Sequence, residues 1–109
     1  HSYGMYSCGL MLFYGDGVEV DKSTGFRYLR KAAENGVSEA MVKCGLILQH
    51  GDGVKINKKE AACLYELAIR KNEYEALLYY GLMLQYGEGI NVDKKKAIRC
   101  FQCNTTWKF

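Results

Sequence analysis

Residues 9–18 read Gly-Leu-Met-Leu-Phe-Tyr-Gly-Asp-Gly-Val, and this stretch returns with small changes further along the chain. Residues 45–54 read Gly-Leu-Ile-Leu-Gln-His-Gly-Asp-Gly-Val, and residues 81–90 read Gly-Leu-Met-Leu-Gln-Tyr-Gly-Glu-Gly-Ile. The spacing is 36 residues both times. A fixed period of this length is typical of a repeat array, in which each unit packs on its neighbours. Such arrays act through extended surfaces, so the period favours binding over catalysis in a pocket.

The composition is that of a small folded domain. The chain has 109 residues, of which 49% are hydrophobic, and this is enough for a core. The net charge is only +3, from 15 basic and 12 acidic residues. We expect no nucleic-acid partner, because nucleic-acid binding needs a concentrated basic face. We also expect no membrane insertion, because no apolar run approaches the ~20 residues of a membrane span.

Each unit is predicted to fold as a helix, a Gly-rich loop and a second helix. In the middle unit, Ala40, Cys44 and Leu48 recur every four residues, which places them on one face of a helix. Gly51 ends that helix, and Asn57 can cap the next one. The chain has no proline and no alternation with a period of two, so we predict an all-α fold. The predicted first helices cover 3–14, 38–50 and 74–86, and the predicted second helices cover 22–35, 58–71 and 94–103.

Glycine recurs in the middle of the first helices, at Gly9, Gly45 and Gly81. Helix propensity disfavours each of them by about 1 kcal/mol. We interpret the three glycines as places where a neighbouring helix comes close, so that dispersion and burial offset the unfavourable propensity.

Further residues recur at fixed places outside the loops. In the middle unit they are Ala40, Gly45, Leu46, Leu48, Gly51, Gly53, Val54, Lys58, Ala61, Tyr65 and Ala68. With these residues the chain resembles the Sel1-like repeats, which are relatives of the tetratricopeptide repeat, over residues 3 to about 102. The 36-residue period argues against the 34-residue tetratricopeptide unit itself.

The resemblance implies a single domain over 1–109, an α/α superhelix (solenoid) of about three helix–loop–helix repeats. The repeats would span approximately 2–37, 38–73 and 74–109, and their first helices would line the concave side. The last repeat is atypical after Gln102, because its tail contains Asn and two Thr, which weaken a helix. The tail can be a cap, a docking segment or the end of a truncated chain, and we favour truncation or poor order.

The five cysteines give no regular pattern. Cys8 and Cys44 share one repeat position, which predicts small buried packing residues. A secreted subclass of the resembled family carries a bonded pair in every repeat, which this chain lacks. An odd, scattered set favours a reducing compartment, so we expect a cytoplasmic protein.

Cys100 and Cys103 have the spacing of half a zinc site. A zinc site needs about four ligands, and neither histidine of the chain lies near this pair in sequence. Cys100 stands where Tyr28 and Leu64 stand in the other units, and we interpret this position as core. We therefore expect no metal and no cofactor.

Catalysis needs a nucleophile with a base held beside it, and the sequence shows no such arrangement. The carboxylates Asp16, Asp52 and Glu88 recur at one loop position, which indicates turn chemistry rather than an acid–base pair. The loops also lack the Lys-Ser/Thr that follows a phosphate-binding loop. We expect no enzymatic activity from this chain.

One stripe of the first helices changes its chemistry from unit to unit, while the packing positions keep their type. Residues three and four apart share a helix face, so the stripe is continuous along each helix. Tyr and Met are favoured at interfaces, and we interpret the stripe as a partner-binding surface on the concave face. The alternative is a stripe that is only solvated or half-packed. The stripe consists of Tyr3, Ser7, Met11, Tyr14, Glu39, Lys43, Ile47, His50, Glu75, Tyr79, Met83 and Tyr86.

The sequence thus favours a non-catalytic scaffold or adaptor module that binds a peptide or a protein segment. The alternative function is a structural spacer within a longer repeat protein, which can carry a catalytic domain such as a kinase. The apolar faces at the two ends of an array also make self-association an expectation.

Overall fold

The structure is a computed structural model that describes the backbone of residues 1–106 and the side chains of residues 1–102. This part of the chain contains six α-helices and no strand, which confirms the predicted all-α fold. The helices are α1 (Ser2–Tyr14), α2 (Lys22–Glu34), α3 (Ser38–His50), α4 (Lys58–Arg70), α5 (Glu75–Tyr86) and α6 (Lys94–Thr106).

The predicted helices are all present, and most of their ends agree to within one residue. The exception is α6, which continues to Thr106 instead of ending at 103. The helix penalties of Asn and Thr are only a few tenths of a kcal/mol each, so they do not end a helix without a stop signal such as Gly or Pro. The alternatives for the tail concern side chains beyond Gln102 and residues 107–109, which lie outside the described part.

Local sequence signals set the helix ends. The first helices end at Gly15, Gly51 and Gly87, whose φ values of 75°, 70° and 70° are left-handed. Side-chain caps begin all three second helices, and in α6 the Asp93 carboxylate accepts a hydrogen bond from the Lys96 N–H at 3.0 Å. The Asp21 carboxylate accepts a hydrogen bond from the Thr24 N–H at 3.1 Å, and the Asn57 amide oxygen accepts one from the Glu60 N–H at 3.1 Å. Repeated stop and start signals thus produce three repeated hairpins.

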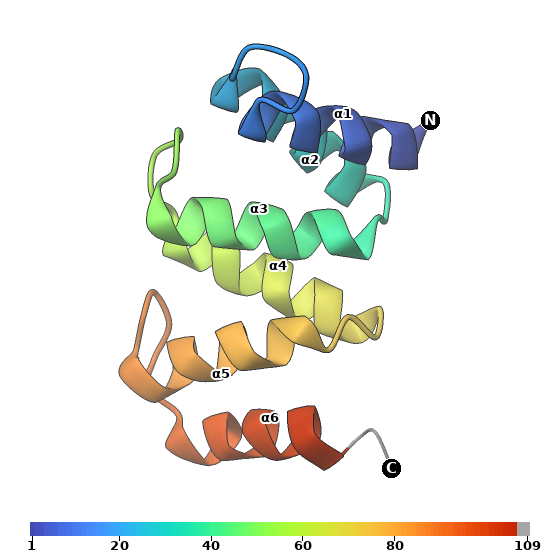
Figure 1. The fold of residues 1–109 in the computed structure, drawn as a ribbon. Coiled ribbons are helices and arrows are strands. Elements are labelled where there is room, and N and C mark those ends of the chain that lie inside the picture. Colours follow the sequence, from blue (N-terminus) through green and yellow to red (C-terminus); the bar gives the residue numbers. More distant parts are fainter. Residues whose placement is uncertain (107–109) are drawn as a thin grey trace.

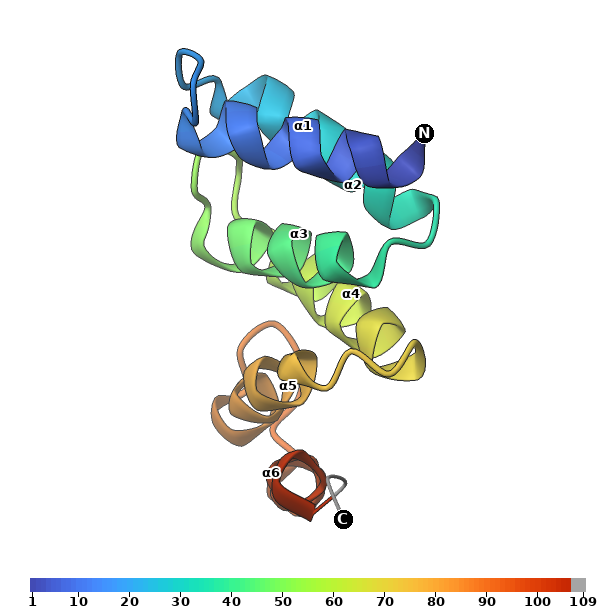
Figure 2. The ribbon, with the colours of Figure 1, turned by 45° about the vertical axis from the view of Figure 1, so that its right-hand side comes forward.

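The hairpins stack in a single row. The two helices of each unit pack on each other, and the second helix of one unit packs on the first helix of the next, α2 on α3 and α4 on α5. The row is elongated, with extents of 43 × 31 × 20 Å (Figure 1). The direction of the helices also changes along the row, since α6 is seen end-on in a view in which α1 lies across the page (Figure 2). The arrangement is a superhelix of repeats.

The helical glycines lie where the two helices of a unit touch. A Cβ at Gly45 would lie 2.5 Å from Cε1 of Tyr65, and a Cβ at Gly81 would lie 2.6 Å from Cε1 of Phe101. At Gly9 the nearest atom is Cγ of Leu29, at 2.7 Å. These distances are too short for any side chain without a shift of its neighbour, which confirms that the second helix comes close.

Two packing predictions for the first unit are wrong. Cys8 and Tyr28 are exposed, although their equivalents Cys44 and Cys100 are buried. The first unit has no helix stacked on this side in the described chain, so the residues that face that way stay uncovered. The buried residue under Gly9 is Leu29, next to Tyr28.

No helix of the described residues has both the length and the apolar character of a membrane span.

Candidate functional site: the first-helix face

The first helices α1, α3 and α5 follow one another along the row (Figure 1). Ten of the twelve predicted partner-binding residues are exposed or half-exposed on these helices, and nine of the ten, all except Met11, lie at repeat positions that stay open in every unit. We call these nine the first-helix face. They are Tyr3, Ser7 and Tyr14 of α1, Glu39, Lys43 and His50 of α3, and Glu75, Tyr79 and Tyr86 of α5.

The other three predicted residues share one repeat position, and the structure removes it from this face. Ile47 and Met83 are only 4% and 0% exposed, so they offer a partner almost no surface. Met11 is exposed, but it lines a separate cavity with Cys8 and Tyr28. The physical reason is helical drift, because each step of four residues turns about 40° beyond a full circle. Two such steps carry the stripe from Tyr3 to Met11 onto the side where repeats stack.

A small groove lies between the C-terminal ends of α1 and α3. Its cavity has a volume of about 170 Å³. The Lys43 ammonium lies 5.7 Å from the centre of the Tyr14 ring, at the distance of a cation–π contact. One ring nitrogen of His50, Nδ1, lies 3.0 Å from the Leu46 carbonyl oxygen of the preceding turn. The groove is lined by Phe13, Tyr14, Lys43, Leu46, Ile47, His50 and Asp52.

Sequence reasoning missed three lining residues of this groove, Phe13, Leu46 and Asp52. Phe13 and Leu46 were interpreted only as parts of the repeated helix pattern, and Asp52 only as a turn residue. The signal for Asp52 was its place directly after the helix that carries Lys43 and His50. Which apolar side chains border a groove depends on how two units are rotated, and a repeat pattern does not contain that angle.

Aromatic side chains on α5 extend the first-helix face. The Tyr79 ring stacks on Tyr65 of α4, with 5.7 Å between the ring centres and 27° between the planes. Tyr65 is itself fixed, since its hydroxyl donates a hydrogen bond of 2.7 Å to Oε1 of Gln49. Burial raises the pKa of Tyr65 well above its ordinary value. Tyr86 and Tyr14, at 67% and 59% exposed, are the most open rings of the face.

Charge is distributed unevenly along the helices of this face. Glu39 and Glu75 lie in the first turns of α3 and α5, and His50 lies in the last turn of α3. This arrangement complements the helix dipoles. It also places the carboxylates of Glu39 and Glu75 at the starts of α3 and α5, whereas the groove is lined by Lys43 and Asp52. The Glu39 carboxylate adds to burial in raising the pKa of Tyr6.

The reactive side chains of the chain lie elsewhere. Burial raises the pKa of the Cys44 thiol to about 12, so this thiol is not a nucleophile near neutral pH. Cys100 is buried, which confirms its predicted place in the core, while the Cys103 side chain lies outside the described residues. Among the described side chains, no group of three or more His, Cys, Asp or Glu residues could hold a metal ion.

Comparisons with known proteins agree on one family. The sequence matches the family model "Sel1 repeat" over residues 2–37, 38–73 and 75–103. A solved Sel1 repeat protein from Oxalobacter formigenes is 27% identical, with a TM-score of 0.86 over 96% of this chain and 43% of that one. A comparison with curated proteins finds no match.

Two further solved structures share the fold. The protein c5321, a protective antigen of uropathogenic Escherichia coli strains with an SLR fold, is 24% identical with a TM-score of 0.93. The match covers 99% of this chain and 23% of that one. Helicobacter pylori cysteine rich protein B is 25% identical with a TM-score of 0.77, and the match covers 94% and 81% of the two chains. The chain therefore spans less than half the length of two of these three proteins.

Proposed function

Because this chain belongs to the Sel1 repeat family, we propose that its first-helix face binds a peptide or a segment of another protein, and that the chain itself catalyses no reaction. Sel1 repeats are in general protein–protein interaction modules. A non-catalytic role is likewise the general role of proteins with these repeats. The partner of this particular chain is part of the proposal.

The observation that carries the proposal is the pairing of Tyr14 and Lys43 across two units. The pair lines a groove that is too small for a folded domain but large enough for a side chain of a partner. An aromatic ring buries about 150–250 Å² when it is covered, and Tyr is enriched among the residues that dominate binding energy. Tyr86 supplies a second open ring on α5.

Rigid support favours binding at this face. Tyr79 is stacked on Tyr65, and Lys43 is held against Tyr14, so these side chains lose little rotamer freedom when a partner covers them. The acidic first turns of α3 and α5 and the Lys43 ammonium in the groove give a bound segment one preferred direction. A partner with an apolar or aromatic anchor and an acidic residue near it fits this arrangement.

The setting of the chain is also a proposal. The segment is shorter than two of its solved relatives, so it can serve a longer protein as one part of a repeat array. In that case it acts as a structural spacer, and other domains determine the activity. Cys8, Cys44 and Cys63 form no disulfide, which supports a reducing compartment such as the cytoplasm.

A peptide library separates binding from a spacer role. We would select peptides from a random phage-displayed library on the wild-type chain, and then measure their affinity for the variant Tyr14→Ala/Lys43→Ala. The variant removes one groove-lining side chain from α1 and one from α3, and we expect the selected peptides to lose about tenfold or more in affinity.

The matched control is Lys31→Ala/Leu67→Ala, which removes one exposed lysine and one exposed large side chain from the second helices. Peptides that bind this control like the wild type, and the groove variant weakly, support the proposal. Equal binding to the groove variant, with circular dichroism unchanged, contradicts it. A library that yields no binder to the wild type also contradicts it and favours the spacer role.

A further inference from the structure

One interface occurs twice inside this chain, and it is held by the same pair of charges each time. Nζ of Lys22 lies 2.5 Å from Oδ1 of Asp52, and Nζ of Lys58 lies 2.6 Å from Oε1 of Glu88. Each lysine is the first residue of a second helix, and each carboxylate belongs to the Gly-rich loop of the following unit. The two pairs are separated by one repeat.

The loop glycine beside each carboxylate completes this contact. A Cβ at Gly53 would lie 2.7 Å from Cβ of Lys22, and a Cβ at Gly89 would lie 2.5 Å from Cβ of Lys58. The loop of each unit therefore rests directly on the start of the preceding second helix. Next to it, Ala62 of α4 and Ile90 of the following loop line a common cavity.

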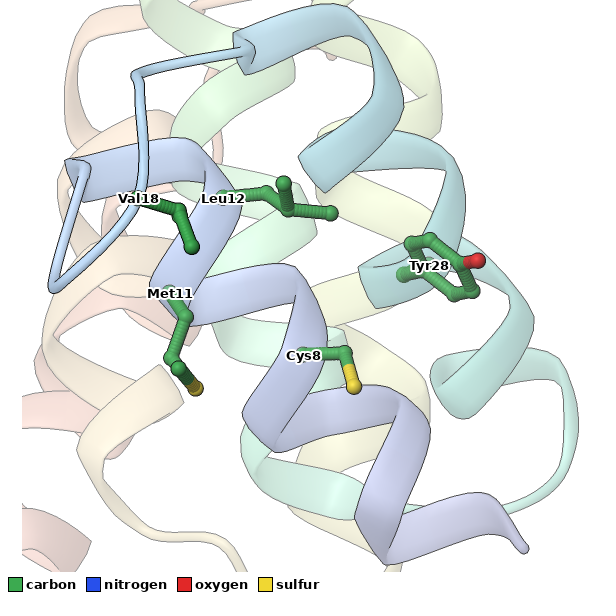
Figure 3. Close-up of a pocket in the computed structure, with 5 residues that line it drawn as sticks. All are labelled: Cys8, Met11, Leu12, Val18 and Tyr28. Carbon is green, nitrogen blue, oxygen red and sulfur yellow. The ribbon is translucent and has the colours of Figure 1, made fainter.

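The first unit shows the same loop surface without its cover. Around Gly17 a Cβ would meet nothing within 4 Å, and Asp16 forms no ion pair with a described side chain. An apolar cavity of about 240 Å³ lies beside this loop. Figure 3 shows that it is formed by α1, the loop and α2. Its lining residues, with Asp16 and Gly17, form what we call the leading face; they are Cys8, Met11, Leu12, Val18 and Tyr28.

The leading face is a stacking surface, as its repeat equivalents show. Cys44, Ile47 and Leu48 of the second unit correspond to Cys8, Met11 and Leu12, and all three are buried. The equivalents are buried because α2 packs on α3. The leading face therefore has the shape and chemistry to receive a second helix that starts with lysine.

The opposite end of the row offers such a helix. Lys94 is the first residue of α6, at the position of Lys22 and Lys58, and it forms no ion pair within the described side chains. Ile98 is 54% exposed, although its equivalents Phe26 and Ala62 are buried. On α5, Leu78 is 42% exposed although its equivalent Val42 is buried, and Leu82 is 39% exposed. We call Leu78, Leu82, Lys94 and Ile98 the trailing face.

We propose that the trailing face of one copy of this chain docks on the leading face of a second copy, in the register of the internal repeats. Lys94 of one copy then pairs with Asp16 of the next and rests on Gly17, and Ile98 covers Val18. The two faces differ from each other, so the contact is head-to-tail and does not close on itself. Copies are expected to form open rows of increasing length.

Charge complementarity is the reason to assign a second copy to this surface. Asp16 and Lys94, which form no ion pair with another described side chain, are opposite in sign and occupy the places of a pair that the chain forms twice. The exposed apolar residues supply the affinity, because an exposed ion pair contributes only about 0.2–1 kcal/mol. The ion pair and Gly17 determine the register.

Sedimentation velocity of the chain at low salt tests the proposal. We expect the sedimentation coefficient to rise with protein concentration without a plateau at the dimer. Asp16→Lys or Lys94→Asp alone brings two like charges together and weakens association by about threefold or more. An equimolar mixture of the two variants restores association, because each contact in it joins opposite charges.

The control is Glu19→Lys, which changes the charge of the same loop by the same amount outside the register. Ile98→Ser tests the apolar part and is expected to weaken association with an unchanged circular dichroism spectrum. A chain that stays monomeric at every concentration overturns the proposal and assigns the two faces to other repeats. Single variants that associate like the wild type overturn it as well, and so does a mixture that fails to recover. These results do not depend on the groove between α1 and α3.

Discussion

The glycines in the middle of the first helices have a poor helix propensity, but they allow the second helix to pack closely. The ring of Tyr65 occupies the space that a side chain at position 45 would need. Glycine loses about 1 kcal/mol of helix propensity there. A larger residue would strain the contact by about 1–3 kcal/mol, so glycine is the better choice in the folded protein. The same arrangement recurs at Gly81 against Phe101.

Adding one methyl group at position 45 is therefore expected to destabilise the chain. We predict that Gly45→Ala lowers the free energy of unfolding by about 1–2 kcal/mol, because overpacking exceeds the gain in propensity. The control is Gly4→Ala in α1, where only Cβ of His1 lies near, at 4.0 Å. This variant is expected to raise stability by up to about 1 kcal/mol. Urea denaturation measures both, and a shift in the same direction for both variants would contradict the packing argument.

At the scale of elements, short local signals define each helix. The stop glycines and the caps Asp21 and Asn57 occur at the predicted places, and therefore the predicted helix starts agree with the structure. The end of α6 was predicted wrongly because it rested on propensity alone, which is a weak signal. A helix boundary is strongly predicted only by a residue that changes the backbone conformation, as glycine does at a helix end, or by a side chain that satisfies the free N–H groups at a helix start.

The Asp21 cap makes the start of α2 sensitive to acid. The backbone N–H of Thr24 holds the pKa of the Asp21 carboxyl below its ordinary value. A lowered folded-state pKa means that the charged cap stabilises the fold above the unfolded pKa and that this contribution is lost as the pH falls through the folded pKa. Asn is also a good cap but carries no charge to favour the helix N-terminus.

We therefore predict that Asp21→Asn melts below the wild type at neutral pH, and that the difference vanishes as the pH falls below roughly 4. Melting temperatures from circular dichroism between neutral and acidic pH measure the gap. Glu19→Gln removes a carboxylate of the same loop outside the cap and is expected to show a smaller gap at neutral pH. A difference that stays constant over the whole pH range would argue against the charged cap.

The whole molecule is a row in which each unit depends on its neighbours. The third unit is joined to the second mainly through the packing of α4 on α5 and through the Lys58–Glu88 pair. The stability of such a row is close to a sum of unit and interface terms. Damage to one interface is therefore expected to loosen one end.

Gly89→Ala tests this coupling. Position 89 has a φ of +75° and would place a Cβ 2.5 Å from Lys58, whereas Gly17 has nearly the same φ of +77° with open space around it. Both variants incur backbone strain of about 1–2 kcal/mol. We predict that only Gly89→Ala also separates the third unit, so that amide hydrogen exchange accelerates in α5 and α6 more than in α1 to α4. Identical exchange patterns in the two variants would contradict the prediction.

The repeat period and the caps were sufficient to predict the helices and their order, because these depend on interactions within one unit. The repetition of one unit three times was sufficient to predict the stacked row. The separation of partner-facing from stacking residues was only partly predictable. Tyr14 and Tyr86 are exposed and Lys43 is half-exposed, as expected, but Ile47 and Met83 are buried. Cys8 and Tyr28 show the opposite case, because they are equivalent to buried residues and yet stay exposed in the first unit.

Exposure of a repeat residue depends on which neighbour stands beside its unit and on how far the two are rotated. The sequence pattern is the same in a repeat that a neighbour covers and in one that stays uncovered. The pattern therefore predicts the helices, but it does not predict which of their surfaces remain exposed. Tertiary structure alone decided that the α1–α3 groove is open and that, among the side chains of residues 1–102, Asp16 and Lys94 form no ion pair like those of Asp52 and Lys58.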